Sequence, residues 1–160
     1  NVDQISREAP QPLRLQRESL RLPLAHDQIA AGFPSPADDY IDVGIDLNEQ
    51  LIRHPSSTFF LRVSGDSMTG AGIHHGDLLV VDRSLDPRPG RVVVAILDGA
   101  FTLKRLVRHR GHLRLEAANP NYPHLDLQRC GDVQIWGVAI HVIIRFSGQF
   151  IAMTKDKYKL

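Results

Sequence analysis

The segment RVVVAILDGAFTLKRLV, residues 91–107, gives the clearest indication of the fold. Two apolar runs, Arg91–Leu97 and Ala100–Val107, flank the dipeptide Asp98-Gly99. An Asp-Gly pair between runs rich in β-branched and aromatic residues is a strong signal for a two-residue hairpin turn, because both turn positions need a positive φ. The sequence therefore predicts an antiparallel hairpin in the second half of the chain.

Similar short apolar runs lie on both sides of this hairpin, and turn residues separate them at fairly regular spacing. The expected strands are Thr58–Val63, Asp77–Asp82, Arg91–Leu97, Ala100–Val107, Leu113–Ala117 and Val133–Phe146. Regular short strands with tight turns are typical of an antiparallel barrel or sandwich. The predicted fold class is therefore mostly β.

The chain before these strands has a different character. Asp46 and Glu49 have the spacing of a helix capping box, so we expect a short helix that begins at Asp46 and ends near His54-Pro55. Residues 1–23 hold three prolines and many charges, and the segment up to Ile45 is polar. We expect residues 1–45 to form an extended, flexible N-terminal arm, residues 46–146 the core domain, and residues 147–160 a mobile tail.

Composition excludes several classes of protein. The chain has 160 residues, of which 42% are hydrophobic, and this suits one globular domain. Nineteen Lys and Arg against 18 Asp and Glu give a net charge of +1, so overall charge does not indicate a nucleic-acid or membrane partner. The single cysteine, Cys130, excludes an internal disulfide framework and suits a reducing compartment. No membrane span or signal peptide is visible, so we expect a cytoplasmic protein.

One serine and one lysine have the residue types of a nucleophile and its base. Ser67 lies in SGDSM after the first core strand, where a sharp turn exposes a hydroxyl beside backbone N–H groups that can hold an oxyanion. Lys104 lies within the apolar run Phe101–Leu106, and burial there disfavours its charged form. A neutral amine beside a hydroxyl can act as a general base. The residue types alone favour the ordinary explanation, in which Ser67 caps a turn and Lys104 extends to water.

Several motifs, taken in order, resemble those of a known family. They are GFPSPADDY from Gly32, SGDSMTGAGIHHGDLLVVD from Ser64, FTLKRL from Phe101, EAANPNYP from Glu116 and WGVAIHVI from Trp136. Over about residues 20–144 the chain is similar to the self-cleaving serine peptidases of the LexA and UmuD family, and the upstream segment is similar to the UmuD branch. The resemblance implies the β-rich core that LexA shares with signal peptidases, preceded by a movable arm.

The same resemblance implies a mechanism and partners. It makes Ser67 the nucleophile, Lys104 the general base and Ala31–Gly32 the bond that is cut. A RecA filament on single-stranded DNA would stimulate this self-cleavage during the SOS response. The shortened homodimer would then serve a UmuC-type polymerase in mutagenic translesion synthesis. We expect no cofactor.

Alternative functions stay open at this point. A polymerase-binding or regulatory module with a dormant Ser-Lys pair would carry the same residues. A fragment of a LexA-like repressor would need a DNA-binding domain before the cut, and the 31 residues that precede Gly32 do not resemble one. A membrane signal peptidase shares the Ser-Lys pair but requires an anchoring segment.

Three further features have ordinary explanations. The pair His74-His75, with His109 and His112, predicts no metal site, because adjacent histidines in a strand point to opposite faces. We interpret Cys130 as a packing residue. Val133–Phe146 is apolar nearly throughout, so we expect part of it to be buried against a second subunit.

A basic run crosses the second predicted hairpin. It consists of Lys104, Arg105, Arg108, Arg110 and Arg114. We interpret it as an exposed hairpin face whose charges protect an edge strand, because no aromatic residues are interleaved for base stacking. Direct DNA binding is therefore not expected.

Overall fold

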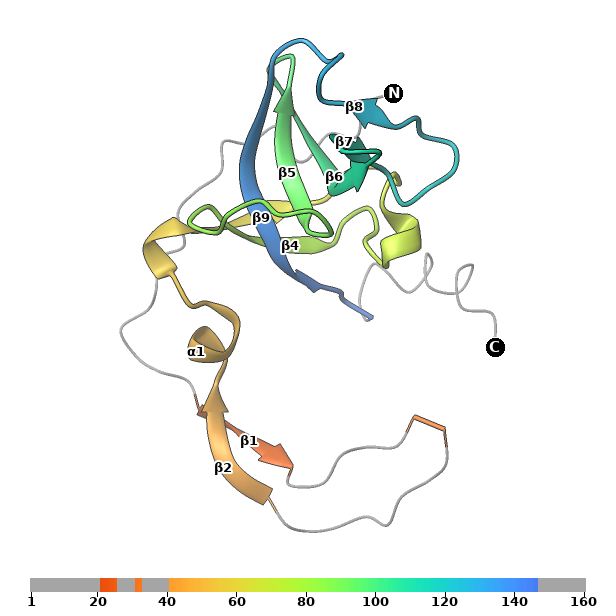
Figure 1. The fold of residues 1–160 in the computed structure, drawn as a ribbon. Coiled ribbons are helices and arrows are strands. Elements are labelled where there is room, and N and C mark those ends of the chain that lie inside the picture. Colours follow the sequence, from red (N-terminus) through yellow and green to blue (C-terminus); the bar gives the residue numbers. More distant parts are fainter. Residues whose placement is uncertain (1–20, 26–30, 33–40, 147–160) are drawn as a thin grey trace. The chain divides into compact units, whose positions relative to one another are not determined.

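A computed structural model of the chain describes residues 21–25, 31–32 and 41–146 (Figure 1). Among these, the residues up to Pro55 form one compact unit and those from Ser56 onward form a second. Residues 147–160, predicted to be a tail, and residues 1–20 of the predicted arm lie outside the described residues. The division into arm, core and tail stays a prediction.

The smaller unit contains a two-stranded antiparallel sheet, with β1 at Arg21–Ala25 and β2 at Ile41–Asp46. The extended chain predicted for these segments is present, and it also pairs, which the sequence pattern did not indicate. The pairing register shifts between Leu22 and Leu24. Pro23 lies at this shift, where it fits because proline has no N–H to contribute to a ladder.

A short helix, α1 at Leu47–Leu51, follows β2 directly. The predicted N-cap is confirmed, since the Asp46 carboxylate accepts a hydrogen bond from the Asn48 N–H at 3.0 Å. The predicted end near His54-Pro55 is wrong. Ile52 already has an extended backbone, with φ −128°, and its side chain is buried, so the chain leaves the helix where this β-branched residue is packed.

The larger unit is one seven-stranded antiparallel sheet in the order β3-β4-β9-β5-β6-β7-β8 (Figure 1). Its strands are β3 (Thr58–Arg62), β4 (Leu78–Asp82), β5 (Val92–Leu97), β6 (Ala100–His109), β7 (His112–Glu116), β8 (Leu125–Asp126) and β9 (Val133–Ile143). The mostly β fold is confirmed. The two-residue β8 was not predicted, because so short a strand has no detectable alternation.

Two hairpin turns of the same geometry join β5 to β6 and β6 to β7. In the first, Asp98 and Gly99 have φ values of 48° and 80°, which confirms the predicted turn. In the second, Arg110 and Gly111 have φ values of 49° and 80°. Positive φ at both central positions is typical of the tight turns that match the twist of paired strands.

Strand β9 lies in the interior of the sheet, between β4 and β5. Trp136, Ala139 and Val142 pack toward one hydrophobic cluster, and Val133, Ile135 and Val138 toward another. A strand paired on both edges and packed on both faces needs apolar residues along its length. The apolar pattern of residues 133–143 is thus explained within one chain, and the strand ends at Ile143, three residues before the predicted end.

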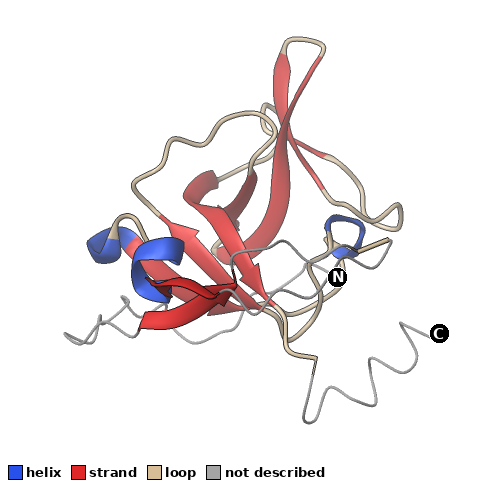
Figure 2. Ribbon diagram, turned by 90° about the horizontal axis from the view of Figure 1, so that it is seen from below, coloured by secondary structure: helices blue, strands red, loops and turns tan. Residues whose placement is uncertain are grey.

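The two clusters cover opposite faces of the central strands. Along β5, Val94 belongs to the first cluster, while Val93 and Ala95 belong to the second. Figure 2 shows strands of this unit crossing at steep angles, as in a strongly twisted sheet. The first cluster, which contains Met68 and Leu103, supports the predicted site. In the described part of the chain, no helix is long and apolar enough to cross a membrane.

Candidate active site

The turn that carries Ser67 is fixed by the burial of the next residue. After β3, Gly65 has φ 97°, and Met68 is inserted into the first hydrophobic cluster with 2% of its surface exposed. A short 3-10 helix at residues 69–71 then leads to Gly72, with φ 78°. Because Met68 is anchored, Ser67 is held against β6, and its surface is fully buried.

Lys104 reaches this serine from the middle of β6. Its Nζ lies 3.0 Å from Ser67 Oγ, 2.8 Å from Thr102 Oγ1 and 3.1 Å from the Leu103 carbonyl oxygen. Thr102 is within reach because residues two apart on a strand point to the same face. Ser67 Oγ also lies 3.5 Å from the Leu103 carbonyl oxygen. The structure therefore brings the two predicted residues into direct contact.

This geometry suits a nucleophile and its general base. Lys104 is only 4% exposed, so the alternative in which its amine extends to water is excluded. Burial of an amine disfavours the charged form. A neutral amine can accept the proton of a hydroxyl at the 3.0 Å separation observed, which is within hydrogen-bond range. The three oxygen partners of Nζ described above are hydroxyl and carbonyl groups, which carry no formal charge.

A second segment, residues 118–122, holds the serine turn from the other side, and we call it the clamp. The Gly70 N–H donates to the Ala118 carbonyl at 2.7 Å, and Asn119 Nδ2 donates to the Asp66 carbonyl at 2.9 Å. The Tyr122 hydroxyl donates to the Asp66 carboxylate. Asp66 immediately precedes Ser67, so these bonds restrain the backbone on which the nucleophile is placed.

The clamp also explains why residue 70 is glycine, and its tyrosine ring lies near Lys104. A Cβ at position 70 would lie 2.5 Å from the Ala118 carbonyl oxygen, so only glycine allows this close approach. The Tyr122 ring centroid lies 5.9 Å from Lys104 Nζ. The clamp thus binds the residues on either side of Ser67 in the serine turn and also lies near Lys104.

Sequence reasoning missed Asp66, Thr102, Asn119 and Tyr122 as parts of the site. The two-residue spacing of Thr102 and Lys104 on a strand is a signal that could have found the first of these contacts. Asn119 and Tyr122 lie in the quoted EAANPNYP motif, but their partner Asp66 is more than 50 residues away in sequence. No local pattern predicts a contact at that separation.

The predicted cleavage site belongs to the smaller unit. Ala31 and Gly32 are both exposed and lie in a bend. Apart from its two chain neighbours, no described residue has a heavy atom within 4 Å of the position that a Cβ would take at Gly32. An exposed, uncrowded peptide bond is accessible to a peptidase.

The histidines and the cysteine do not assemble a site of their own. His74 and His75 lie in the turn before β4, outside every predicted strand, and the Gly65 N–H donates to His75 Nδ1 at 3.3 Å. Across the described ranges, no group of three or more His, Cys, Asp or Glu side chains is arranged to hold a metal ion. Cys130 is a free thiol of intermediate exposure.

With this geometry established, comparison with known proteins gives the family. Residues 23–140 match the model of the family described as Peptidase S24-like. The chain belongs to the Peptidase S24-like family. Ser67, Lys104, the clamp and the Ala31–Gly32 bond all lie within the matched residues.

Relatives in this peptidase family include proteins of the type predicted from the motifs. The chain is 48% identical to protein ImpA of Escherichia coli over 124 residues, which cover 77% of this chain and 83% of ImpA. It is 45% identical to protein MucA of Escherichia coli over 77% of this chain and 84% of MucA. It is 36% identical to the LexA repressor of Verrucomicrobium spinosum over 86% of this chain and 67% of the repressor. The predicted LexA and UmuD family is therefore confirmed.

Proposed function

We propose that the chain is a self-cleaving serine peptidase of the SOS response, which cuts its own Ala31–Gly32 bond with Ser67 and Lys104. The observation that carries this proposal is the 3.0 Å contact between Lys104 Nζ and Ser67 Oγ in a buried setting. Membership of the Peptidase S24-like family supports the same chemistry.

The reaction proceeds in two steps, formation of an ester between Ser67 and Ala31 and its hydrolysis by water. Ser67 Oγ attacks the Ala31 carbonyl carbon while its proton passes to the neutral Lys104 amine. The C–N bond then breaks, the lysine returns the proton to the Gly32 nitrogen, and an ester between Ser67 and Ala31 forms. A water molecule attacks this ester, Lys104 accepts one of its protons, and that proton returns to Ser67 Oγ as the Ala31 carboxylic acid leaves and releases its remaining proton to solvent.

Neighbouring groups hold the base in line. Thr102 Oγ1 and the Leu103 carbonyl accept hydrogen bonds from Nζ, so they fix the amine against the serine. A free lysine has a pKa of about 10.4, whereas a base that works near neutral pH needs a much lower pKa. Burial of the amine acts in that direction.

Regulation and partners follow from the family. In this proposal a RecA filament on single-stranded DNA stimulates the cut by favouring the cleavable pose of the arm, since the Ser-Lys pair is already assembled. The product then joins a UmuC-type polymerase in translesion synthesis in the cytoplasm. The processed form acts as a homodimer, and the partly exposed Ile143, Ile144 and Phe146 offer apolar surface for association.

The decisive experiment is the intact mass of the protein before and after incubation with RecA on single-stranded DNA and a nucleotide. We expect a new N-terminus at Gly32 and a product of residues 32–160. Ser67→Ala should give no product, while Ser56→Ala, an exposed serine of the same unit, and Cys130→Ala should cut normally. An uncut wild-type protein, both with RecA and in alkaline buffer, would instead support the module with a dormant pair.

A further inference from the structure

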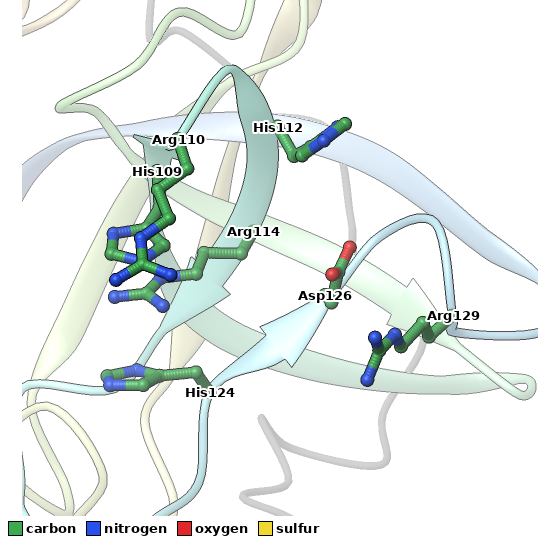
Figure 3. A pocket seen from close by; sticks show the side chains of 7 residues that line it. All are labelled: His109, Arg110, His112, Arg114, His124, Asp126 and Arg129. Carbon is green, nitrogen blue, oxygen red and sulfur yellow. The ribbon is translucent and has the colours of Figure 1, made fainter.

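A cavity of about 310 Å³ lies on the β6-β7-β8 part of the sheet, away from the Ser-Lys pair. Its lining consists of His109, Arg110, His112, Arg114, His124, Asp126 and Arg129 (Figure 3). Six of these seven side chains present nitrogen atoms, and none is apolar. A cavity of this size lies at the lower end of the range for small-molecule sites.

Strand register explains why these side chains meet. His109 is opposite His112, Val107 opposite Arg114, and Arg114 opposite Asp126. The alternate positions on the same strands, Leu106, Leu113, Leu115 and Leu125, pack into the second hydrophobic cluster. The hairpin therefore has one apolar face toward the core and one polar face on which the cavity forms.

Ion pairs and hydrogen bonds fix part of the lining. Arg114 Nε donates to Glu116 Oε1 at 2.6 Å, and Glu116 lies 3.9 Å from His124 Nδ1. Gln128 Nε2 lies 2.8 Å from His112 Nδ1. A guanidinium carries five N–H donors in a rigid fork that matches an oxyanion such as phosphate.

Arg110 and Arg114 lie apart from the Asp126 carboxylate in the cavity, and the carboxylate on their own side is that of Glu116, which lies 2.5 Å from Arg114 Nη2. In Figure 3 the side chains of His109, Arg110 and Arg114 gather on one side with His124 near them, whereas Asp126 lies on the other side near Arg129. The Asp126 carboxylate accepts a hydrogen bond from the Gln128 N–H at 3.0 Å. The side of Arg110 and Arg114 is thus the part suited to an anion.

Arg110 occupies a backbone position that disfavours it. The two hairpin turns have nearly the same φ values at Asp98 and Arg110. Aspartate is one of the residue types that tolerate the left-handed conformation, whereas arginine adopts it less readily. Unfavourable backbone geometry is retained most often where a side chain has a function. The earlier interpretation, in which the basic run protects an edge strand, does not fit this hairpin, because the outermost strand here is β8 rather than β6 or β7.

We propose that this cavity binds a phosphate group, with Arg110 and Arg114 as its principal ligands. Free phosphate compounds and the phosphodiester backbone of single-stranded DNA share this chemistry. The inference is independent of the proposed self-cleavage, so it is tested on the full-length Ser67→Ala protein, which is expected to stay intact.

The first measurement uses inorganic phosphate alone. The ring-proton NMR signals of His109 and His124 should shift in a saturable manner, while those of His74, which lies outside the cavity, should not. The second uses fluorescence anisotropy with a short fluorescein-labelled oligothymidylate. Here Arg110→Asn and Arg114→Gln should each weaken binding about tenfold and reduce the salt dependence by about one unit of slope.

Arg88→Gln is the matched control, because Arg88 is exposed on the loop between β4 and β5 and its loss removes the same charge. Saturable shifts with phosphate but no effect of Arg110→Asn on the oligonucleotide would support a small phosphate compound as the ligand. Oligonucleotide binding that depends on Arg110 would support DNA. Absence of saturable shifts, together with equal effects of Arg110→Asn and Arg88→Gln, would overturn the proposal.

Discussion

The two halves of β6 carry similar side chains in opposite environments. In the first half Lys104 is 4% exposed and contacts Ser67, whereas in the second half Arg105 and Arg108 are exposed. The serine turn and the clamp contact the first half, while the second half pairs with β7 and presents its polar face as the wall of a cavity. The chemistry of a basic side chain on this strand is therefore set by the segments packed over it.

The largest difference between the two halves of β6 should appear when lysine and arginine are exchanged. Lys104→Arg should reduce self-cleavage about a thousandfold or more, even in alkaline buffer, because a guanidinium stays protonated and cannot accept the Ser67 proton. Arg105→Lys, the matched change one residue later, should leave the rate within about twofold. Mass spectrometry of timed samples measures both. Full alkaline cleavage by Lys104→Arg would show that another base activates the serine.

A change in pH tests the buried half without a mutation. The neutral amine is the active form, so the rate should be low when Lys104 is protonated, rise about tenfold per pH unit, and level off above its lowered pKa. Spontaneous cleavage without RecA should therefore appear as pH rises from neutral to alkaline. Arg110→Asn should give the same profile, because Arg110 is exposed in the turn that follows the second half of β6. A rate that does not depend on pH would contradict the role of Lys104.

Loss of one clamp bond should produce a smaller effect. Tyr122→Phe keeps the ring near Lys104 but removes the hydroxyl that binds the Asp66 carboxylate. We expect a rate about tenfold lower, since Ser67 is then less well positioned, and no shift in the pH midpoint. Asn121→Ala, an exposed neighbour in the same segment, is the control and should cut normally. An unchanged rate in Tyr122→Phe would show that the clamp has no positioning role.

The smallest expected effect concerns the turns at the two ends of β6. Arg110→Asn should raise the free energy of unfolding by about 1 kcal/mol, and Asp98→Arg should lower it by a similar amount, because asparagine and aspartate tolerate a positive φ better than arginine. Thermal denaturation should show this as opposite changes of about 2–4 °C in Tm. Changes of the same sign in both variants would contradict the explanation.

Elements whose causes are local could be predicted from the amino-acid sequence. The Asp98-Gly99 turn, the N-cap at Asp46 and most strand positions were predictable, because turn conformation, capping and alternation depend on residues close together in the chain. The motifs also indicated Ser67 and Lys104 through the family resemblance. The helix end at Leu51 was not predictable from the pattern, because the burial of Ile52 depends on packing.

Contacts between segments that are distant in the chain depend on the folded arrangement of the whole sheet. Ser67 and Lys104 are 37 residues apart, and Asp66 and Tyr122 are 56 apart. The interior position of β9, the short β8 and the cavity beside Arg110 likewise depend on strand order and register. Such contacts form because the sheet buries both hydrophobic clusters at once, and the net energy of that packing is distributed over the whole unit rather than encoded in any one stretch.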